Sequence, residues 1–267
     1  MNLRHVLALV LLTILLVSCG GGGLTTTTVS AEGLRYGRIA TFTVEGPNLD
    51  KGITFVAPKC TGVKEVEGGT QTVRTYTCTP ATSGLMQVLV VGGSTVLRST
   101  NFDIAVPRVM MVTNLGNIEL ELDPKAAPLS VENFVKYVNA NFYDKLIFHR
   151  VVADFVIQGG GFDESFVAAE PRAAIKLEVN NGLSNLRGTL AMARTAALDS
   201  GTSQFYINLK DNINLDTDSG GYAVFGKVRS GMEVVDLIGA LPTTRTAGGL
   251  THVPTPPVVI LSTVQTQ

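Results

Sequence analysis

Short runs of apolar and β-branched residues recur along most of the chain, and they predict strands rather than helices. In the first half these runs are separated by Gly and Pro, and the expected strands are Ile39–Val44, Ile53–Val56, Val73–Cys78 and Leu85–Val91. Further runs follow Pro107, and the expected strands there are Met110–Asn114, Ile118–Leu122, Leu146–Val151, Val156–Gly159, Thr189–Arg194, Phe205–Asn208 and Ala223–Val228. The pattern predicts a mainly β protein.

A helical period is present in two stretches of the second half. Ser130 can cap the first, whose apolar stripe consists of Val131, Phe134, Val135 and Val138. The second stretch is Met232–Gly239, with apolar residues at a spacing of three. Two helices among many strands predict a barrel or closed sheet with a helix at each end.

Composition narrows the function classes. The chain has 267 residues, which allows one large domain or two modest ones. Charged residues make up 16% and the net charge is −1, so a basic nucleic-acid groove is disfavoured. With 45% hydrophobic residues the chain is not mostly disordered, and 3 Cys and 3 His leave little room for a metal site.

The sequence of the amino terminus predicts an export signal. The apolar run Val6–Val17 has 12 residues, too few to cross a membrane but typical of a signal peptide. It ends in Leu16-Val17-Ser18-Cys19, which resembles the bacterial lipobox. We therefore expect a signal peptide at 1–18, lipid on Cys19 and a Gly- and Thr-rich tether over 19–30. The resemblance implies a periplasmic protein anchored to the envelope, at the outer membrane because no Asp follows Cys19; the alternative is an ordinary signal peptide with an incidental cysteine.

Residues 31–105 are expected to form a small β-sandwich-like domain of the immunoglobulin type, stapled by a disulfide. Cys60 and Cys78 flank a hairpin whose turn signal is Gly68-Gly69, and a three-residue loop would place the two cysteines directly opposite each other. In an exported protein such a bridge is worth about 3 kcal/mol. The alternative is a pair of unbridged thiols in the core.

Four sequence blocks in the second half are more specific. They are Phe148-His149-Arg150-Val151-Val152 with 154–161, then Gly188–Arg194, then Ser203-Gln204-Phe205-Tyr206-Ile207, and finally Tyr222–Val228 with Gly231-Met232. In this order and spacing they resemble the cyclophilin family of peptidyl-prolyl cis-trans isomerases, over about Arg108 to Gln267. The resemblance implies an eight-stranded antiparallel barrel capped by two helices at 107–267, the catalysis of X–Pro isomerisation, and neither cofactor nor metal.

Rotation about an X–Pro bond needs a particular kind of catalyst. The barrier is about 18–20 kcal/mol because the amide loses its resonance, but no proton has to move. The catalyst has to offer a hydrogen-bond donor to the prolyl nitrogen and a dry apolar slot for the ring. Arg150 suits the first role because its guanidinium stays charged. An acid–base role for His149 is disfavoured, and we interpret it as a barrel residue.

The resemblance also implies the positions of the site. Arg150, Phe155 and Gln158 match catalytic positions of the family, and the matches to substrate-binding positions are Val156, Ala193, Arg194, Gln204, Tyr206, Leu215 and Tyr222. Asn214 stands where many members carry Trp, which puts strong cyclosporin binding in doubt. Taken without the resemblance, Phe155 and Tyr206 could belong to the barrel core, and Arg150 could pair with Asp144, Asp154 or Asp163 on the surface.

Two functional hypotheses remain. The first is a lipid-anchored isomerase that accelerates the folding of exported proteins, with proline-containing segments of unfolded or partly folded proteins as its partners. The membrane would be contacted through the lipid alone, and no nucleic acid is expected. The second is a barrel that binds proline peptides or an envelope protein without turnover, with the amino-terminal domain as a docking arm. Intact Arg150, Phe155, Gln158 and Gln204 favour the enzyme.

Overall fold

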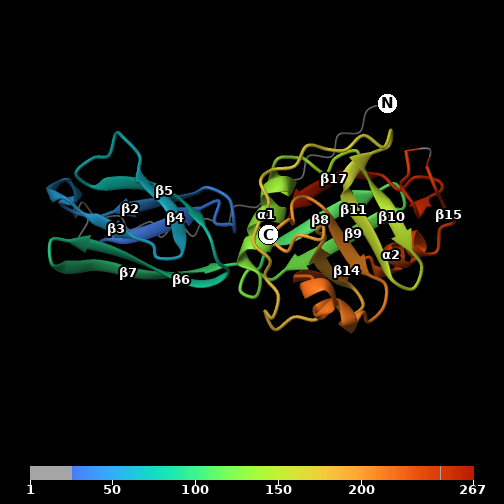
Figure 1. The fold of residues 1–267 in the computed structure, drawn as a ribbon. Helices are drawn as coiled ribbons and strands as arrows, with labels where there is room; N and C mark the ends of the chain where they lie inside the picture. The colour runs from blue at the N-terminus through green and yellow to red at the C-terminus, as the bar shows by residue number, and fades with distance from the viewer. Residues whose placement is uncertain (1–25, 247) are drawn as a thin grey trace, which may run out of the picture.

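The computed structural model describes residues 26–246 and 248–267, which form two lobes joined near residues 105–107 (Figure 1). The predicted signal peptide, Cys19 and most of the predicted tether lie outside the described residues. None of the helices in the described part of the chain is long and apolar enough to span a membrane.

The amino-terminal domain is a two-sheet β-sandwich. One sheet has the order β1-β2-β5-β4, formed by β1 (Thr28–Glu32), β2 (Ala40–Glu45), β5 (Val73–Pro80) and β4 (Cys60–Glu65). The other has the order β3-β6-β7, formed by β3 (Thr54–Val56), β6 (Gly84–Gly92) and β7 (Thr95–Ile104), and a short 3-10 helix, η1 (Leu49–Lys51), precedes it. The rings of Phe42, Phe55 and Tyr76 pack between the sheets, with Phe55 stacked on Tyr76 at 4.6 Å.

Two details of this domain correct the sequence predictions. The predicted tether over 19–30 extends too far toward the carboxy terminus. Thr28 already belongs to β1, where it pairs with Glu45 of β2. The predicted register of the cysteines is also wrong: Cys60 lies opposite Pro80, because the register shifts between Thr61 and Lys64. A disulfide nevertheless joins Cys60 to Cys78, with Cα atoms 5.7 Å apart.

The carboxy-terminal domain is a nearly closed eight-stranded antiparallel barrel, as predicted. Its strand order is β10-β11-β13-β12-β14-β9-β8-β17. The strands are β8 (Arg108–Thr113), β9 (Gly116–Leu122), β10 (Leu146–Val152), β11 (Val156–Asp163), β12 (Thr189–Met192), β13 (Phe205–Asn208), β14 (Val224–Ser230) and β17 (Ile260–Gln265). An isolated bridge between Ile147 of β10 and Val259, the residue before β17, joins the two edges of the sheet. The small strands β15 (Thr243–Thr244) and β16 (Val253–Pro254) pair outside the barrel.

Two helices pack against the barrel. In α1 (Pro128–Asn139) the whole predicted apolar stripe is buried, and the ring of Phe134 lies 5.4 Å from the rings of both Phe205 and Phe225. The second helix, α2 (Met232–Gly239), has the predicted bounds and buries Val235 and Ile238. Gly231 precedes it with φ 90°, and a side chain there would collide with the backbone of Asn117.

The amino terminus of α1 differs from the prediction. The helix begins at Pro128, so Ser130 lies inside its first turn and is not the N-cap. The carboxylate of Glu178, 48 residues further on, accepts hydrogen bonds from the backbone N–H groups of Leu129 and Ser130 and from the Ser130 hydroxyl. A distant acid therefore satisfies the free donors of the first turn and complements the helix dipole.

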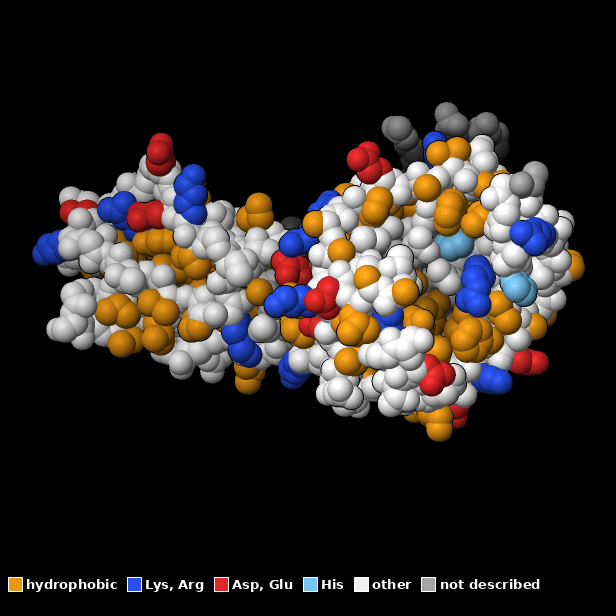
Figure 2. All heavy atoms as spheres, viewed as in Figure 1, with side chains coloured by type: hydrophobic (Ala, Val, Ile, Leu, Met, Phe, Trp, Pro, Cys, Tyr) orange, Lys and Arg blue, Asp and Glu red, His pale blue; other side chains and the backbone are white. Residues whose placement is uncertain are grey.

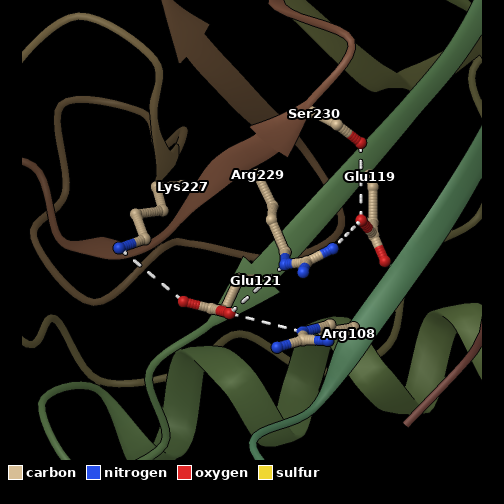
Figure 3. Close-up of polar contacts among 6 residues, drawn as sticks. All are labelled: Arg108, Glu119, Glu121, Lys227, Arg229 and Ser230. Carbon is tan, nitrogen blue, oxygen red and sulfur yellow. Dashed lines mark hydrogen bonds and ion pairs between the residues drawn. The ribbon is translucent and has the colours of Figure 1, made fainter.

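Opposite charges connect neighbouring strands on the outside of the barrel (Figure 3). Glu121 on β9 lies 3.3 Å from Arg108 on β8 and 3.6 Å from Lys227 on β14, and Arg229 lies 2.6 Å from Glu119. Each exposed pair contributes only about 0.2–1 kcal/mol, so this network supports the strand order without being its main cause.

The two lobes contact each other through the loop between β1 and β2. Tyr36 of this loop is buried, and its carbonyl accepts a hydrogen bond from Gln265 at 2.9 Å. Arg38 donates to Asn139 at the end of α1, at 2.7 Å. The amino-terminal domain is therefore held against the helix side of the barrel by more than the linker.

The disulfide should stabilise the amino-terminal domain alone. It closes a loop over a sequence separation of 18. Removing such a cross-link lowers the free energy of unfolding by about 3 kcal/mol. In the double variant Cys60→Ser, Cys78→Ser, hydrogen exchange should become faster in peptides from 28–104 and stay unchanged in peptides from 108–267. Reduced wild-type protein is the matched control and should behave like the variant. Equal protection of both domains in variant and wild type would contradict this role.

Candidate active site

The hydrogen-bond register of the barrel brings four strands together in one row. Arg150 on β10 pairs with Gln158 on β11, Gln158 pairs with Tyr206 on β13, and Tyr206 pairs with Ala191 on β12. Alternate residues of a strand face opposite sides of a sheet. The next row is Val151, Ile157, Ile207 and Leu190, and all of these are buried in the barrel core. The first row therefore lies on the outer face.

A pocket of about 250 Å³ lies on this outer face. Its lining residues are Arg150, Phe155, Val156, Gln158, Ala193, Arg194, Tyr206, Leu215 and Tyr222. All nine belong to the predicted site, and the tenth predicted residue, Gln204, lines an adjoining cavity of about 110 Å³ together with Gln158. The structure thus brings the predicted residues together, although they are spread along the chain from Arg150 to Tyr222.

A chain of side-chain amides positions Arg150. Its Nη1 lies 3.4 Å from Oε1 of Gln158, whose Nε2 donates to Oε1 of Gln204 at 2.9 Å. The guanidinium carbon lies 5.9 Å from the centre of the Phe155 ring. The alternative of an ion pair with Asp144, Asp154 or Asp163 is not observed, and no carboxylate of the described chain pairs with Arg150. Its half-buried charge therefore stays available to a ligand.

The apolar walls form a cluster of their own, separate from the barrel core. The buried members are Val156, Ala191, Ala193, Tyr206 and Val224, with Phe155, Leu183, Leu215 and Tyr222 packed against them. The rings of Tyr206 and Tyr222 meet edge to face at 6.0 Å. Burial, reinforced by Tyr222 and Asp216, raises the pKa of Tyr206, so its hydroxyl stays protonated. The alternative that Phe155 and Tyr206 belong to the barrel core does not hold.

Arg194 has a different position from Arg150. Its guanidinium donates to the carbonyl oxygens of Ser219 and Gly221, and its carbon lies 4.5 Å from the centre of the Tyr222 ring. The strand β12 ends at Met192 rather than at the predicted Arg194. Arg194 therefore fixes the loop that carries Tyr222.

Asn214 lies outside the pocket. It is exposed in the 3-10 helix η2 (Ile213–Asp216), and its side chain donates to Asp218 of the following η3 (Asp218–Gly220) at 2.9 Å. Its neighbour Leu215 supplies the apolar wall. Asn214 itself therefore contributes no wall to the pocket.

A cluster of hydrogen-bonded polar residues that the sequence did not indicate lies directly behind the pocket. Ser184 and Asn185 both donate to the carboxylate of Asp216, and the Tyr206 hydroxyl donates to Asn185 at 2.7 Å. Burial would raise the pKa of Asp216, but these hydrogen bonds outweigh it and lower the pKa below its usual value. Ser184, Asn185 and Asp216 lie outside the four sequence blocks, and a buried loop amide has no periodic signal.

His149 is a barrel residue that does not line the pocket, as the sequence suggested. It is 4% exposed, and its ring meets Phe162 edge to face at 4.9 Å. Burial lowers its pKa from 6.5 to about 4. A neutral imidazole next to Arg150 adds no competing positive charge to the site at neutral pH.

A larger cavity, about 480 Å³, lies at the junction of the two lobes. Ser83 and Val106 line it from the amino-terminal side, and Leu183, Ser184 and Val224 are among its barrel residues. It contains none of the ten predicted site residues. Size alone therefore does not identify the reactive site.

Figure 2 shows one face of the molecule, on which hydrophobic side chains of the barrel lobe lie beside basic and histidine side chains.

Fold and site define a barrel that presents an arginine, unpaired with any carboxylate of the described residues, beside a slot with apolar walls. The family model described as "Cyclophilin type peptidyl-prolyl cis-trans isomerase/CLD" matches residues 108–265. The chain belongs to this family, and it is a peptidyl-prolyl cis-trans isomerase. The matched range begins at the first barrel strand, so the amino-terminal domain lies outside it.

Bacterial relatives and solved structures agree with this assignment. The chain is 54% identical over 156 residues to the peptidyl-prolyl cis-trans isomerase of Acinetobacter baylyi, which covers 58% of this chain and 82% of the relative. It is 46% identical over 155 residues to peptidyl-prolyl cis-trans isomerase B of Escherichia coli, covering 56% and 94%. A cyclophilin-type isomerase of Cryptosporidium parvum superposes with a TM-score of 0.52 and 25% identity, covering 61% and 99%. The same protein, crystallised in the presence of the dipeptide Ala-Pro, gives 0.51 at 25% identity, covering 60% and 99%.

The buried His149 should make the protein less stable in acid. Between pH 6.5 and about 4 the unfolded chain binds a proton at this residue and the folded chain does not, so stability falls as the pH falls through that window. From about pH 7.5 to about pH 5 the loss should be about 2 kcal/mol larger in wild type than in His149→Gln. Urea unfolding at the two pH values measures it. Equal losses in the two proteins would show that His149 is not held neutral.

Proposed function

We propose that Arg150 accelerates X–Pro isomerisation by donating a hydrogen bond to the prolyl nitrogen as the amide twists. The observation that carries this proposal is the pocket in which a guanidinium, unpaired with any carboxylate of the described chain, borders an apolar slot. As the amide loses its resonance, a lone pair localises on the prolyl nitrogen, which only then becomes a good acceptor. Arg150 thus stabilises the transition state more than the ground state.

The remaining pocket residues hold the substrate. The proline ring enters the slot formed by Phe155, Val156, Tyr206, Leu215 and Tyr222. Ala193 and Arg194 border both the pocket and the adjoining cavity, so the peptide chain runs along them. The solved relative crystallised with Ala-Pro supports a proline-containing ligand. A charged hydrogen bond supplies about 1.5–3 kcal/mol, or on the order of 10–100-fold. Desolvation and positioning supply the rest.

The cellular role we propose is the folding of exported proteins. The run Val6–Val17 and the following Cys19 support export and lipid attachment. A disulfide in the amino-terminal domain is consistent with an oxidising compartment such as the periplasm. Isomerisation consumes no ATP, which suits that location. Proline-containing segments of unfolded exported proteins are then the partners. The protein contacts the membrane through its lipid alone, and we propose that this membrane is the outer membrane.

Arg150→Ala should lower kcat/KM for an X–Pro tetrapeptide by at least about tenfold, because one charged hydrogen bond in the transition state is lost. Peptide affinity should change little, since the slot stays intact. A protease-coupled assay and a peptide titration measure the two quantities. Arg98→Ala, on the exposed edge of β7 in the other domain, is the matched control.

The same assay tests the alternative, a binding module without turnover. A folded wild-type chain that binds the peptide and does not accelerate its isomerisation would support the binder. Unchanged kcat/KM in Arg150→Ala would instead keep the enzyme and remove the proposed role of the arginine.

Lipid attachment should depend on Cys19. Expressed in a Gram-negative host supplied with labelled palmitate, the full chain should incorporate the label and sediment with outer membranes. Cys19→Ser should do neither. Labelling that persists in this variant would place the lipid elsewhere, and an unlabelled wild type would indicate the ordinary signal peptide.

A further inference from the structure

Asn185 is a polar residue in a loop, yet it is wholly buried, with 0% exposure. It lies between Leu183, which packs on the pocket cluster, and β12. Loop amides usually face water, and burying one without partners costs free energy. Its position therefore calls for a complete set of hydrogen bonds.

The side chain of Asn185 makes that full set. Its Oδ1 accepts from the Tyr206 hydroxyl at 2.7 Å and from Nδ2 of Asn208 at 3.1 Å. Its Nδ2 donates to Oδ1 of Asp216 at 2.8 Å and to the carbonyl of Tyr222 at 3.3 Å. An asparagine side chain has two donor hydrogens and one acceptor oxygen with two lone pairs. All four positions are used.

These partners belong to walls of the pocket that come from separate segments. Tyr206 is on β13, Leu215 precedes Asp216 in η2, and Tyr222 follows η3. The N–H of Tyr222 also donates to the carbonyl of Leu215 at 2.9 Å. One side chain therefore connects the three walls from behind, where no substrate reaches.

The contact with Tyr206 has a further consequence for the slot. A tyrosine hydroxyl must find a partner when it is buried. Because Asn185 accepts this hydroxyl, Tyr206 can offer its ring alone to a ligand. Without Asn185 the hydroxyl would need water or a rotated ring, and either change would spoil the slot for proline.

We propose that Asn185 is a positioning residue of the isomerase, which preforms the proline slot by fixing Tyr206, the Leu215 segment and Tyr222. This inference rests on the proposed role of the pocket as the proline site. Asp216 assists, because its carboxylate accepts from the side chain and from the backbone N–H of Asn185. Arg150 lies outside this set of bonds, since its contacts run to Gln158 and Gln204. Loss of Asn185 should therefore change KM, which reports on peptide binding, and leave kcat, which reports on the rotation step, nearly unchanged.

The test compares KM and kcat of wild type and variants for an X–Pro tetrapeptide. Both quantities are measured by NMR line-shape analysis. Asn185→Ala should raise KM about tenfold and change kcat less than about twofold. In a Tyr206→Phe background, where no hydroxyl needs a partner, the same substitution should raise KM by a clearly smaller factor. This non-additivity is a readout that a loss of general stability would not produce.

Asn114→Ala is the matched control. Asn114 also makes two side-chain hydrogen bonds, to the backbone of Pro257 and Val259, but it contacts no pocket residue. Its loss should leave KM unchanged. Should Asn185→Ala not fold, Asp216→Ala removes the bonds between Asn185 and the Leu215 segment from the half-buried side and should raise KM severalfold.

Unchanged KM in a folded Asn185→Ala or Asp216→Ala protein would overturn the inference. So would equal factors for Asn185→Ala in the wild-type and Tyr206→Phe backgrounds, or an equal rise in Asn114→Ala. These results differ from a failure of the proposed function, in which wild type itself shows no turnover or Arg150→Ala keeps full kcat.

Discussion

A full positive charge next to an apolar slot, with no carboxylate of the described chain to neutralise it, is the constraint on which this site depends. A buried or half-buried arginine usually pairs with an acid, and such a pair would occupy the donors that the prolyl nitrogen needs. Here Gln158 and Gln204 orient Arg150 without cancelling its charge. The neutral His149 next to it adds no repulsion at neutral pH. The site therefore keeps a charged donor ready beside the apolar side chains of the slot.

The strand register of the barrel fixes the positions of the site residues relative to one another. Because Arg150, Gln158 and Tyr206 are direct partners across β10, β11 and β13, the donor, its amide support and the floor of the slot keep fixed separations. A slip of one residue in any of these strands would send its side chains to the other face. The inner row, the two helices and the bridge between Ile147 and Val259 keep that register in place. Rigidity here serves preorganisation rather than stability alone.

Local signals allowed a good part of the structure to be predicted. The bounds of α2 and β13 agree with the apolar pattern, since both elements are short and Gly231 limits α2 at its start. The four sequence blocks contain every pocket residue except Leu215. Two of the failures depend on partners distant in the chain: the α1 cap comes from Glu178, and the bonds of Asn185 run to residues 21 or more positions away. The register of Cys60 was wrong for a local reason, because the bulge between Thr61 and Lys64, which contains Gly62 at φ 64°, shifts the pairing of β4 with β5.

The central claim is that the preformed pocket itself catalyses the rotation of a bound amide. Exchange NMR of an X–Pro peptide with a small amount of the wild-type chain tests it most directly, because the cis and trans signals are followed without a coupling protease. The account predicts exchange peaks at mixing times of about a second, whereas the free peptide needs tens to hundreds of seconds. Peptide signals that broaden on binding while exchange stays at the uncatalysed rate would contradict it.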